Sequence, residues 1–268
     1  MSIRFDRVSK SFGTKRVLDE VSFDVKTGEI LFILGRSGMG KSVTLKQMIG
    51  LLKADSGNIF VDDQEVTRLN ENQLAGVRQK CGMVFQHPAL LDSLTVFENI
   101  AFGLKTPQFI KRQGGPLPSE EIQRRVQQKL SLVHLSTDVL ERFPSELSYG
   151  MQKRVSLART LAPSPSYLLF DEPTTGLDPI TTNAINDLIH DLSKKLQVTS
   201  IVVSHDMACA LKIADRVLVL DQGKILAHTT RAQLKLSKEP LIRDFLSETL
   251  ALLPPEERAE ARAEVTAT

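Results

Sequence analysis

Apolar and polar residues alternate near the start of the chain and give way to continuous apolar runs further on. Residues 3–9 and 21–25 alternate, which is typical of half-buried antiparallel strands. The runs 168–170 and 201–204 are almost entirely apolar, which favours parallel strands covered on both faces of a sheet. The pattern predicts an α/β fold in which a β-rich first part precedes a parallel sheet.

Helical spacing dominates the middle of the chain, from residue 87 to about residue 163. Within it, residues 105–119 are rich in Pro, Gly and charge, so we expect an exposed loop there. We predict a single domain over residues 1–246, in which a helical subdomain (about 87–163) is inserted into the α/β core. The tail, 247–268, is charged and rich in Ala, and predicts a solvated or frayed C-terminal helix.

A glycine-rich run, GRSGMGKS, joins a predicted strand to a predicted helix at residues 35–42. Its glycines let the backbone turn tightly and aim several N–H groups at one anion, and the start of a helix also favours phosphate. Lys41 adds a cation for terminal phosphates, and Ser42 offers a hydroxyl to Mg²⁺. The residues predicted to bind the nucleotide here are Gly35, Arg36, Ser37, Gly38, Met39, Gly40, Lys41, Ser42 and Val43.

An apolar strand ends in two acids in the run SYLLFDEP, residues 166–173. Asp171, at the strand end, is suited to hold Mg²⁺ through water. Glu172 points differently and can orient or deprotonate a water for attack. A phosphate-binding loop and a strand-end pair of acids together predict a site that hydrolyses a nucleotide.

Composition narrows the range of partners. The formal net charge of +2 gives no support for a nucleic-acid-binding surface. No apolar run approaches the roughly 20 residues needed to span a bilayer, and the first residues lack a hydrophobic signal segment. Cys81 and Cys209 have no metal-ligand spacing, which favours isolated thiols in a reducing compartment. If the protein works at a membrane, it must dock onto other chains.

These motifs resemble those of ATP-binding cassette (ABC) ATPases, the nucleotide-binding subunits of ABC transporters, and the resemblance covers nearly the whole chain. Phe12 matches the family's aromatic residue that stacks on adenine. Gln86 matches the glutamine that contacts Mg²⁺ and senses the helical subdomain. His205, in IVVSHD, matches the histidine that contacts the γ-phosphate.

Two further landmarks of the family concern a second chain. The run LSYGMQKR, 147–154, resembles the signature motif and retains Ser148 and Gly150, which in the family face the nucleotide of an opposing subunit. Asp178, in TTGLDP, matches the acid of the loop that crosses the dimer interface. The resemblance therefore implies a dimer of this chain with two composite ATP sites.

The resemblance implies a P-loop NTPase (RecA-like) core with an antiparallel β subdomain and an inserted α-helical subdomain. It implies ATP and Mg²⁺ as cofactors, the metal being held by Ser42, Gln86 and Asp171, with Glu172 and His205 as the catalytic residues. It also implies integral membrane permease partners, so that the chain would work on the cytoplasmic face of the inner or cell membrane, without nucleic acid.

The signature departs from the usual Leu-Ser-Gly-Gly-Gln, because Tyr149 replaces the first Gly and Met151 replaces the Gln. Mla/Mce-type phospholipid transport ATPases often carry Met at the second of these positions, and residues 35–57 and 86–104 resemble them as well. We therefore expect transport of phospholipid. An importer of a small solute, such as a polar amino acid, is the alternative.

The run PALLDSLTV, 88–96, is apolar with few charges. We expect it to form part of the surface that ABC subunits offer to a membrane domain, although it could simply cover the helical subdomain. ABC ATPases that act in translation or DNA repair are a third, less favoured class. Translation members usually carry two cassettes on one chain and repair members insert long coiled coils, whereas this sequence has one phosphate loop and no such insertion.

Overall fold

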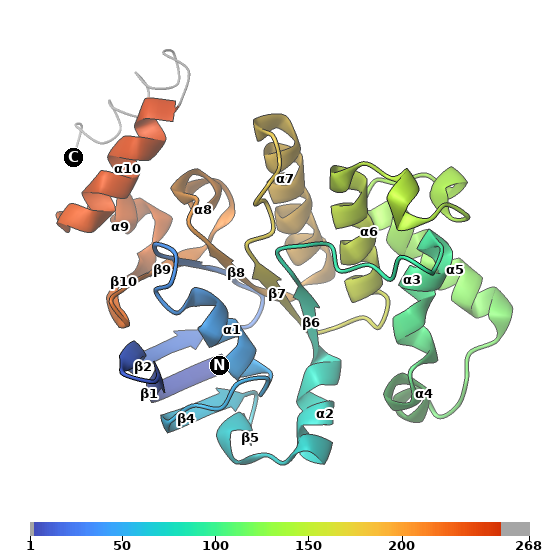
Figure 1. Ribbon diagram of the computed structural model, residues 1–268, viewed down its shortest axis with the longest axis horizontal. Coiled ribbons are helices and arrows are strands. Elements are labelled where there is room, and N and C mark those ends of the chain that lie inside the picture. The colour runs from blue at the N-terminus through green and yellow to red at the C-terminus, as the bar shows by residue number, and fades with distance from the viewer. Residues whose placement is uncertain (1–2, 253–268) are drawn as a thin grey trace.

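The computed structural model describes residues 3–252, which form two sheets and the helices around them (Figure 1). The smaller sheet is antiparallel, with strand order β2-β1-β4-β5. The alternation of apolar and polar residues in β1 matches their burial: Ile3, Phe5 and Val8 are buried, and the residues between them are more exposed. Its strands are β1 (Ile3–Phe12), β2 (Lys15–Val25), β4 (Ser56–Val61) and β5 (Gln64–Glu65).

The larger sheet has strand order β10-β9-β3-β8-β7-β6, and all neighbours are parallel except β10 and β9. Strands β3, β7 and β8 are buried along their whole length, as their apolar runs predict. Because parallel strands end at one edge, the residues that follow β3, β7 and β8 meet there. The strands are β3 (Ile30–Leu34), β6 (Cys81–Val84), β7 (Tyr167–Asp171), β8 (Thr199–Ser204), β9 (Arg216–Asp221) and β10 (Lys224–Thr230).

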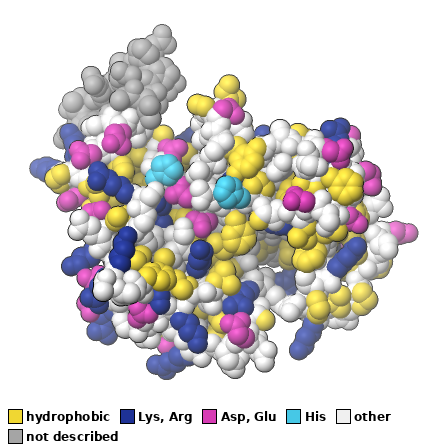
Figure 2. Space-filling model, viewed as in Figure 1, with side chains coloured by type: hydrophobic (Ala, Val, Ile, Leu, Met, Phe, Trp, Pro, Cys, Tyr) yellow, Lys and Arg dark blue, Asp and Glu magenta, His cyan; other side chains and the backbone are white. Residues whose placement is uncertain are grey.

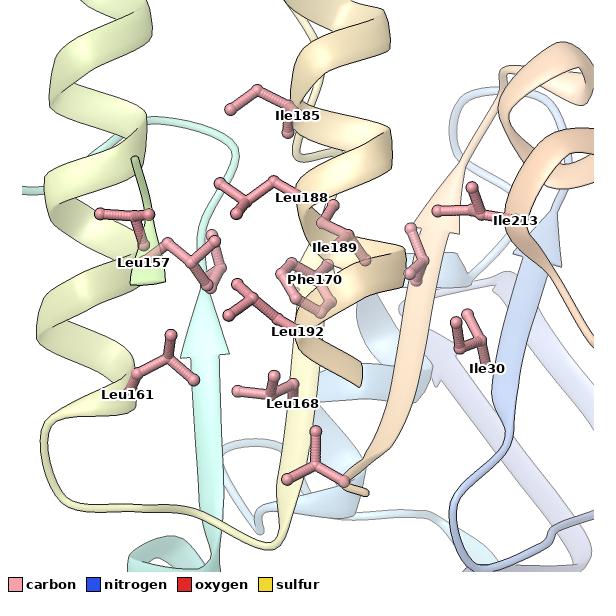
Figure 3. Packing of buried hydrophobic residues seen from close by; sticks show 14 of the residues in the cluster. Ile30, Leu157, Leu161, Leu168, Phe170, Ile185, Leu188, Ile189, Leu192 and Ile213 are labelled. Carbon is pink, nitrogen blue, oxygen red and sulfur yellow. The ribbon is translucent and has the colours of Figure 1, made fainter. Parts of the chain in front are cut away.

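Helices pack on the larger sheet and share its core. Figure 3 shows Leu188 and Leu192 of α7 packed with Leu157 of α6 and Phe170 of β7. A second cluster joins α1 to the smaller sheet, with Leu45 packed among residues of both sheets. The helices next to the sheets are α1 (Lys41–Met48), α2 (Glu71–Lys80), α7 (Pro179–Leu196) and α8 (Met207–Ile213), with a short 3-10 helix at Val66–Arg68.

Between β6 and β7 the chain forms helices alone, on the right of Figure 1. The first, α3, begins with Thr95, whose side chain accepts a hydrogen bond from Glu98 N, while the Glu98 carboxylate accepts one from Thr95 N. The helices are α3 (Val96–Ala101), α4 (Pro107–Gln113), α5 (Ser119–Leu132) and α6 (Tyr149–Leu161), with 3-10 helices at Phe102–Lys105, Thr137–Val139 and Pro144–Glu146.

Helix α4 lies inside residues 105–119, for which the sequence predicts an exposed loop; that prediction was wrong for residues 107–113, although most of the segment is exposed. Thr106 caps the helix by accepting from Phe109 N at 3.4 Å, Pro107 occupies its first position, and Gly114 ends it with φ 80°. The Pro and Gly residues that suggested a loop stand at the two ends of the helix, where both are favourable. The buried ring of Phe109 anchors α4 in the core.

The last described elements are α9 (Arg231–Lys235) and α10 (Pro240–Leu252). Residue 247, at which the predicted tail starts, lies inside α10, whose apolar residues Ile242 and Leu246 are buried. Residues 253–268 lie outside the described part of the chain. None of the helices within residues 3–252 is both long enough and apolar enough to cross a membrane.

Candidate functional site

The glycine-rich loop joins β3 to α1 at the edge where the parallel strands end. Gly38 and Gly40 have φ angles of 79° and 98°, in the left-handed region that favours glycine. A Cβ atom on Gly40 would lie 2.7 Å from Leu18 Cδ2 and 2.8 Å from the Val17 carbonyl oxygen, so a side chain does not fit there. Gly40 is the N-cap of α1 and no side chain caps this helix, which leaves its first N–H groups for an anion.

The other loop residues are held against the end of β9. A Cβ atom on Gly35 would lie 2.5 Å from the Leu220 carbonyl oxygen, so the loop approaches that strand closely. Met39 Sδ accepts a hydrogen bond from Gln222 N at 3.3 Å. Arg36, Ser37 and Gly38 are exposed, and Val43 is half-buried. The loop therefore has a fixed backbone and an open outer face.

Lys41 and Ser42 connect the loop to the acids that end β7. Lys41 is buried, and its Nζ donates to the carbonyl oxygens of Gly35 at 2.7 Å and Arg36 at 3.2 Å. Ser42 Oγ donates to Asp171 Oδ1 at 2.6 Å. A hydroxyl and a carboxylate are the hard oxygen ligands that Mg²⁺ prefers, and this ion usually takes only one or two carboxylates besides the phosphates of its substrate. In keeping with that, the described residues contain no group of three or more His, Cys, Asp or Glu side chains placed to hold a metal alone.

Glu172 lies between a cation and an imidazole. Its Oε1 is 3.3 Å from Lys41 Nζ, and its Oε2 is 2.9 Å from His205 Nδ1 and accepts from Thr175 Oγ1 at 3.3 Å. The residue has φ 49°, a strained value for a side chain of this size, and its N–H donates to the Val203 carbonyl oxygen at 3.0 Å. Strain of this kind persists where the surrounding structure holds it. The two neighbouring acids contact different partners, because Asp171 accepts from Ser42 whereas Glu172 contacts Lys41 and His205.

We call these residues the phosphate-loop cluster. They come from the ends of three neighbouring strands, β3, β7 and β8, and the contacts above link them directly. The members are Lys41, Ser42, Asp171, Glu172 and His205.

A second group lies around the start of α6. Ser148 caps this helix by accepting from Met151 N at 3.3 Å, and it is exposed. Gly150 follows, and a Cβ atom on it would lie 3.1 Å from Thr181 Cγ2 of α7. Asp178 caps α7 and accepts from the N–H and Oγ1 of Thr181; these hydrogen bonds hold the pKa of Asp178 below its usual range.

Gln86 joins this second group through its backbone. Its side chain is exposed, and its carbonyl oxygen accepts from Lys153 Nζ and from Tyr149 Oη, the latter at 3.4 Å. Lys153 is 3% exposed, and burial lowers the pKa of its ammonium to about 8, so it stays mostly charged at neutral pH. We call Gln86, Ser148, Tyr149, Gly150 and Lys153, together with Asp178, the signature cluster.

Phe12 stands apart from both clusters, at the end of β1. Half of its surface is exposed, and Lys10 Nζ lies 5.4 Å from the centre of its ring. An exposed aromatic ring beside a turn of the smaller sheet is unlike a core phenylalanine and is free to stack on a flat ligand.

The sequence profile of the ABC transporter family matches residues 18–175. The chain belongs to the ABC transporter family. It is therefore an ATPase that binds ATP with Mg²⁺, and its fold is the ABC ATPase fold of P-loop NTPase type, as the sequence predicts.

Among curated proteins, the chain is 41% identical over 249 residues to the methionine import ATP-binding protein MetN of Carboxydothermus hydrogenoformans, covering 92% of this chain and 71% of the relative. It is 38% identical over 252 residues to MetN of Clostridioides difficile, covering 94% of this chain and 76% of the relative. About a quarter of each relative lies outside the matched part.

Two solved structures share the fold. The ATP-binding cassette MJ0796, solved as a dimer in a post-hydrolysis state with ADP and phosphate, superposes with a TM-score of 0.76 at 30% identity over 85% of this chain and 98% of that one. CbiO1 from Clostridium perfringens, part of an ABC transporter complex, superposes with a TM-score of 0.80 at 25% identity over 97% of this chain and 98% of that one.

Two contacts of this ABC ATPase lie beyond what the sequence motifs indicate. Thr175 bonds to the Glu172 carboxylate, and Lys153 bonds to the Gln86 carbonyl. Thr175 lies in the TTGLDP run, so its proximity to Glu172 in sequence was a usable signal. Lys153 lies 67 residues from Gln86, and no sequence pattern brings the two together.

Proposed function

We propose that this chain is the ATP-hydrolysing subunit of an ABC importer for methionine or a similar small polar solute. The observation that supports the proposal is the similarity to methionine import ATP-binding proteins over 92–94% of the chain. These relatives favour the small-solute alternative over the phospholipid transport that the Mla/Mce resemblance predicts.

In this proposal the phosphate-loop cluster carries the chemistry. The loop's N–H groups and Lys41 bind the phosphates and stabilise the charge that develops on them. Ser42, Asp171 and Gln86 would hold Mg²⁺, which would supply further stabilisation of that charge. Glu172 orients the attacking water and takes up its proton, and His205 contacts the terminal phosphate while its Nδ1 keeps the Glu172 carboxylate in place.

A second copy of the chain completes each site. Ser148 and Asp178, which cap the first turns of α6 and α7, are both exposed. Ile180, close to Asp178 in α7, is 83% exposed. In the dimer, Ser148 and Gly150 of one copy face the phosphates bound to the loop of the other, and Phe12 stacks on the adenine.

The membrane partner would dock on the helical side of the molecule, on the cytoplasmic face of the membrane. Figure 2 shows hydrophobic side chains gathered on this face, over the part where Figure 1 places β6 and α3 to α6. Exposed Leu91 lies within residues 88–96, the run that the sequence predicts to contact a membrane domain, and exposed Phe85 and Phe102 lie on either side of that run. We propose that this surface receives the permease.

Phospholipid transport is a second candidate, favoured by one observation. Met151 replaces the glutamine of the usual signature, and its side chain packs against the main hydrophobic core, where a glutamine amide would be less favourable. This residue distinguishes the chain from the usual motif and is one of the features on which the Mla/Mce resemblance rests, together with residues 35–57 and 86–104.

Capture of the permease and direct transport assays separate the two candidates. Tagged Glu172→Gln protein would be used to capture its complex from detergent-solubilised membranes, and the co-purifying permease, identified by mass spectrometry, would be reconstituted with wild-type chain in vesicles. ATP-dependent accumulation of radiolabelled methionine is the expected result. Transfer of fluorescent phosphatidylethanolamine without methionine uptake would contradict the importer proposal and support the second candidate.

A further inference from the structure

The segment after β6, residues 85–89, has no regular secondary structure, and one helix supplies the donors for its carbonyl groups. Lys153 Nζ donates to the Gln86 carbonyl oxygen, and Arg159 Nη1 donates to that of Ala89 at 2.7 Å. Both donors belong to α6, the helix that begins directly after Ser148. The position of this segment therefore depends on α6 rather than on strand pairing.

Lys153 is the unusual member of this set. Burial of an ammonium group is costly, and a buried ion paired with one carbonyl is weak evidence for a stabilising role. Tyr149, one helical turn earlier, shares its target: its hydroxyl is 3.4 Å from the Gln86 carbonyl oxygen and 3.4 Å from His87 Nδ1. The Lys153 ammonium also lies 5.4 Å from the centre of the Tyr149 ring, within reach of a cation–π interaction.

These contacts matter because the Gln86 side chain is exposed. Its backbone fixes the point and the initial direction from which the amide projects. A backbone held by two donors from α6 limits that direction, whereas a free loop would leave the amide to sample many positions.

We propose that Lys153, assisted by Tyr149, is a positioning residue for ATP hydrolysis that fixes the Gln86 backbone and thereby aims the Gln86 amide at the Mg²⁺ and γ-phosphate site. The inference rests on the role proposed above for Gln86 and is independent of the cargo. It also makes α6 serve two sites, since the helix holds Gln86 for the nucleotide of its own chain and presents Ser148 to that of the second chain.

The central test is Lys153→Met, which keeps most of the apolar length of the side chain and removes the ammonium. We expect kcat to fall about 10-fold, because a hydrogen bond from a charged donor is lost. The Mg²⁺ concentration that gives half-maximal rate should rise several-fold, while binding of fluorescent ATP analogue without Mg²⁺ stays within twofold of wild type. Lys153→Arg, which keeps a charged donor of similar reach, should restore most of the rate.

The matched control is Lys129→Met, which removes another buried ammonium, in α5. It should leave kcat and the Mg²⁺ requirement as in wild type. An equal loss in Lys129→Met and Lys153→Met, or wild-type values of both quantities in Lys153→Met, would overturn the proposal.

Amide hydrogen exchange provides a readout that needs neither turnover nor metal. Lys153→Met should speed exchange over residues 85–89, and Lys129→Met should not. Faster exchange with unchanged kcat and Mg²⁺ requirement would overturn the positioning role. If wild-type chain alone shows no turnover, or if Lys153→Met does not fold, Tyr149→Phe, which removes a single hydroxyl, decides the matter: exchange at residues 86–87 should rise about threefold, and an unchanged exchange rate would overturn the proposal.

Discussion

The phosphate-loop cluster and the signature cluster are built in opposite ways. In the first, Lys41 and Asp171 are buried and their charged groups contact partners in the same cluster. In the second, Ser148 and Asp178 are exposed and their side chains cap the helices to which they belong. The first cluster is therefore connected within one chain, whereas the exposed residues of the second, Ser148 and Asp178, are the ones that the proposed dimer would bring to a nucleotide bound by another chain.

The largest expected effect tests the chemistry of the phosphate-loop cluster. Glu172→Gln should bind ATP normally and hydrolyse it at least ~100-fold more slowly, because the residue that orients and deprotonates water is lost. Lys41→Ala should lose nucleotide affinity instead. Steady-state turnover and binding of a fluorescent ATP analogue measure the two. Near-normal turnover by Glu172→Gln would contradict the role of this carboxylate.

A second prediction concerns the rigidity of the glycine-rich loop that leads into Lys41 and Ser42. Gly40→Ala places a Cβ atom against Val17 and Leu18 and forces a left-handed backbone on alanine, so we expect the free energy of unfolding to fall by about 2–4 kcal/mol. Urea denaturation measures it. Gly114→Ala is the matched control: its φ is 80° but its Cβ has open space, so it should cost only about 1 kcal/mol. Equal losses in the two variants would show that contact with Val17 and Leu18 is unimportant.

The third prediction asks whether the two clusters meet across a dimer. Ser148→Arg chains alone and Lys41→Ala chains alone should each lack a working site. An equal mixture should regain part of the activity, because each mixed dimer keeps one site with Lys41 from one chain and Ser148 from the other. ATP-dependent dimerisation and turnover are the measurements. If wild type dimerises and the mixture shows neither, composite sites are excluded.

The smallest effect concerns a group outside both clusters. Burial, and after it the neighbouring Arg216 guanidinium, lowers the pKa of His228 below its usual value of about 6.5. The unfolded chain therefore binds a proton more readily than the folded one, so the stabilising contribution is complete above pH 6.5 and is lost as the pH falls below it. Denaturation curves between pH 5 and pH 8 should show this loss, and His228→Gln should reduce it. His190→Asn, in α7, is the control and should behave as wild type.

Much of this protein could be predicted from the sequence, because short runs of residues carry the signal. The phosphate loop needs glycines at positions whose left-handed backbone is set by adjacent residues, and a strand that ends in two acids is recognisable by its apolar run. The α/β class could be predicted in the same way, because parallel strands buried on both faces appear in the sequence as continuous apolar runs. Helix α4 was missed because Pro107 and Gly114 mark both loops and helix ends, and only the burial of Phe109 separates the two readings.

Contacts between distant residues were decided by the tertiary structure alone. Ser42 meets Asp171 across 129 residues, and Lys153 meets Gln86 across 67, because parallel strands end at one edge and α6 packs beside β6. The sequence around a lysine in a helix does not indicate which carbonyl its side chain will contact, because that contact depends on how two elements pack. The sequence by itself predicted the chemistry of the phosphate-loop cluster, and the packing of α6 decided how the Gln86 backbone is held.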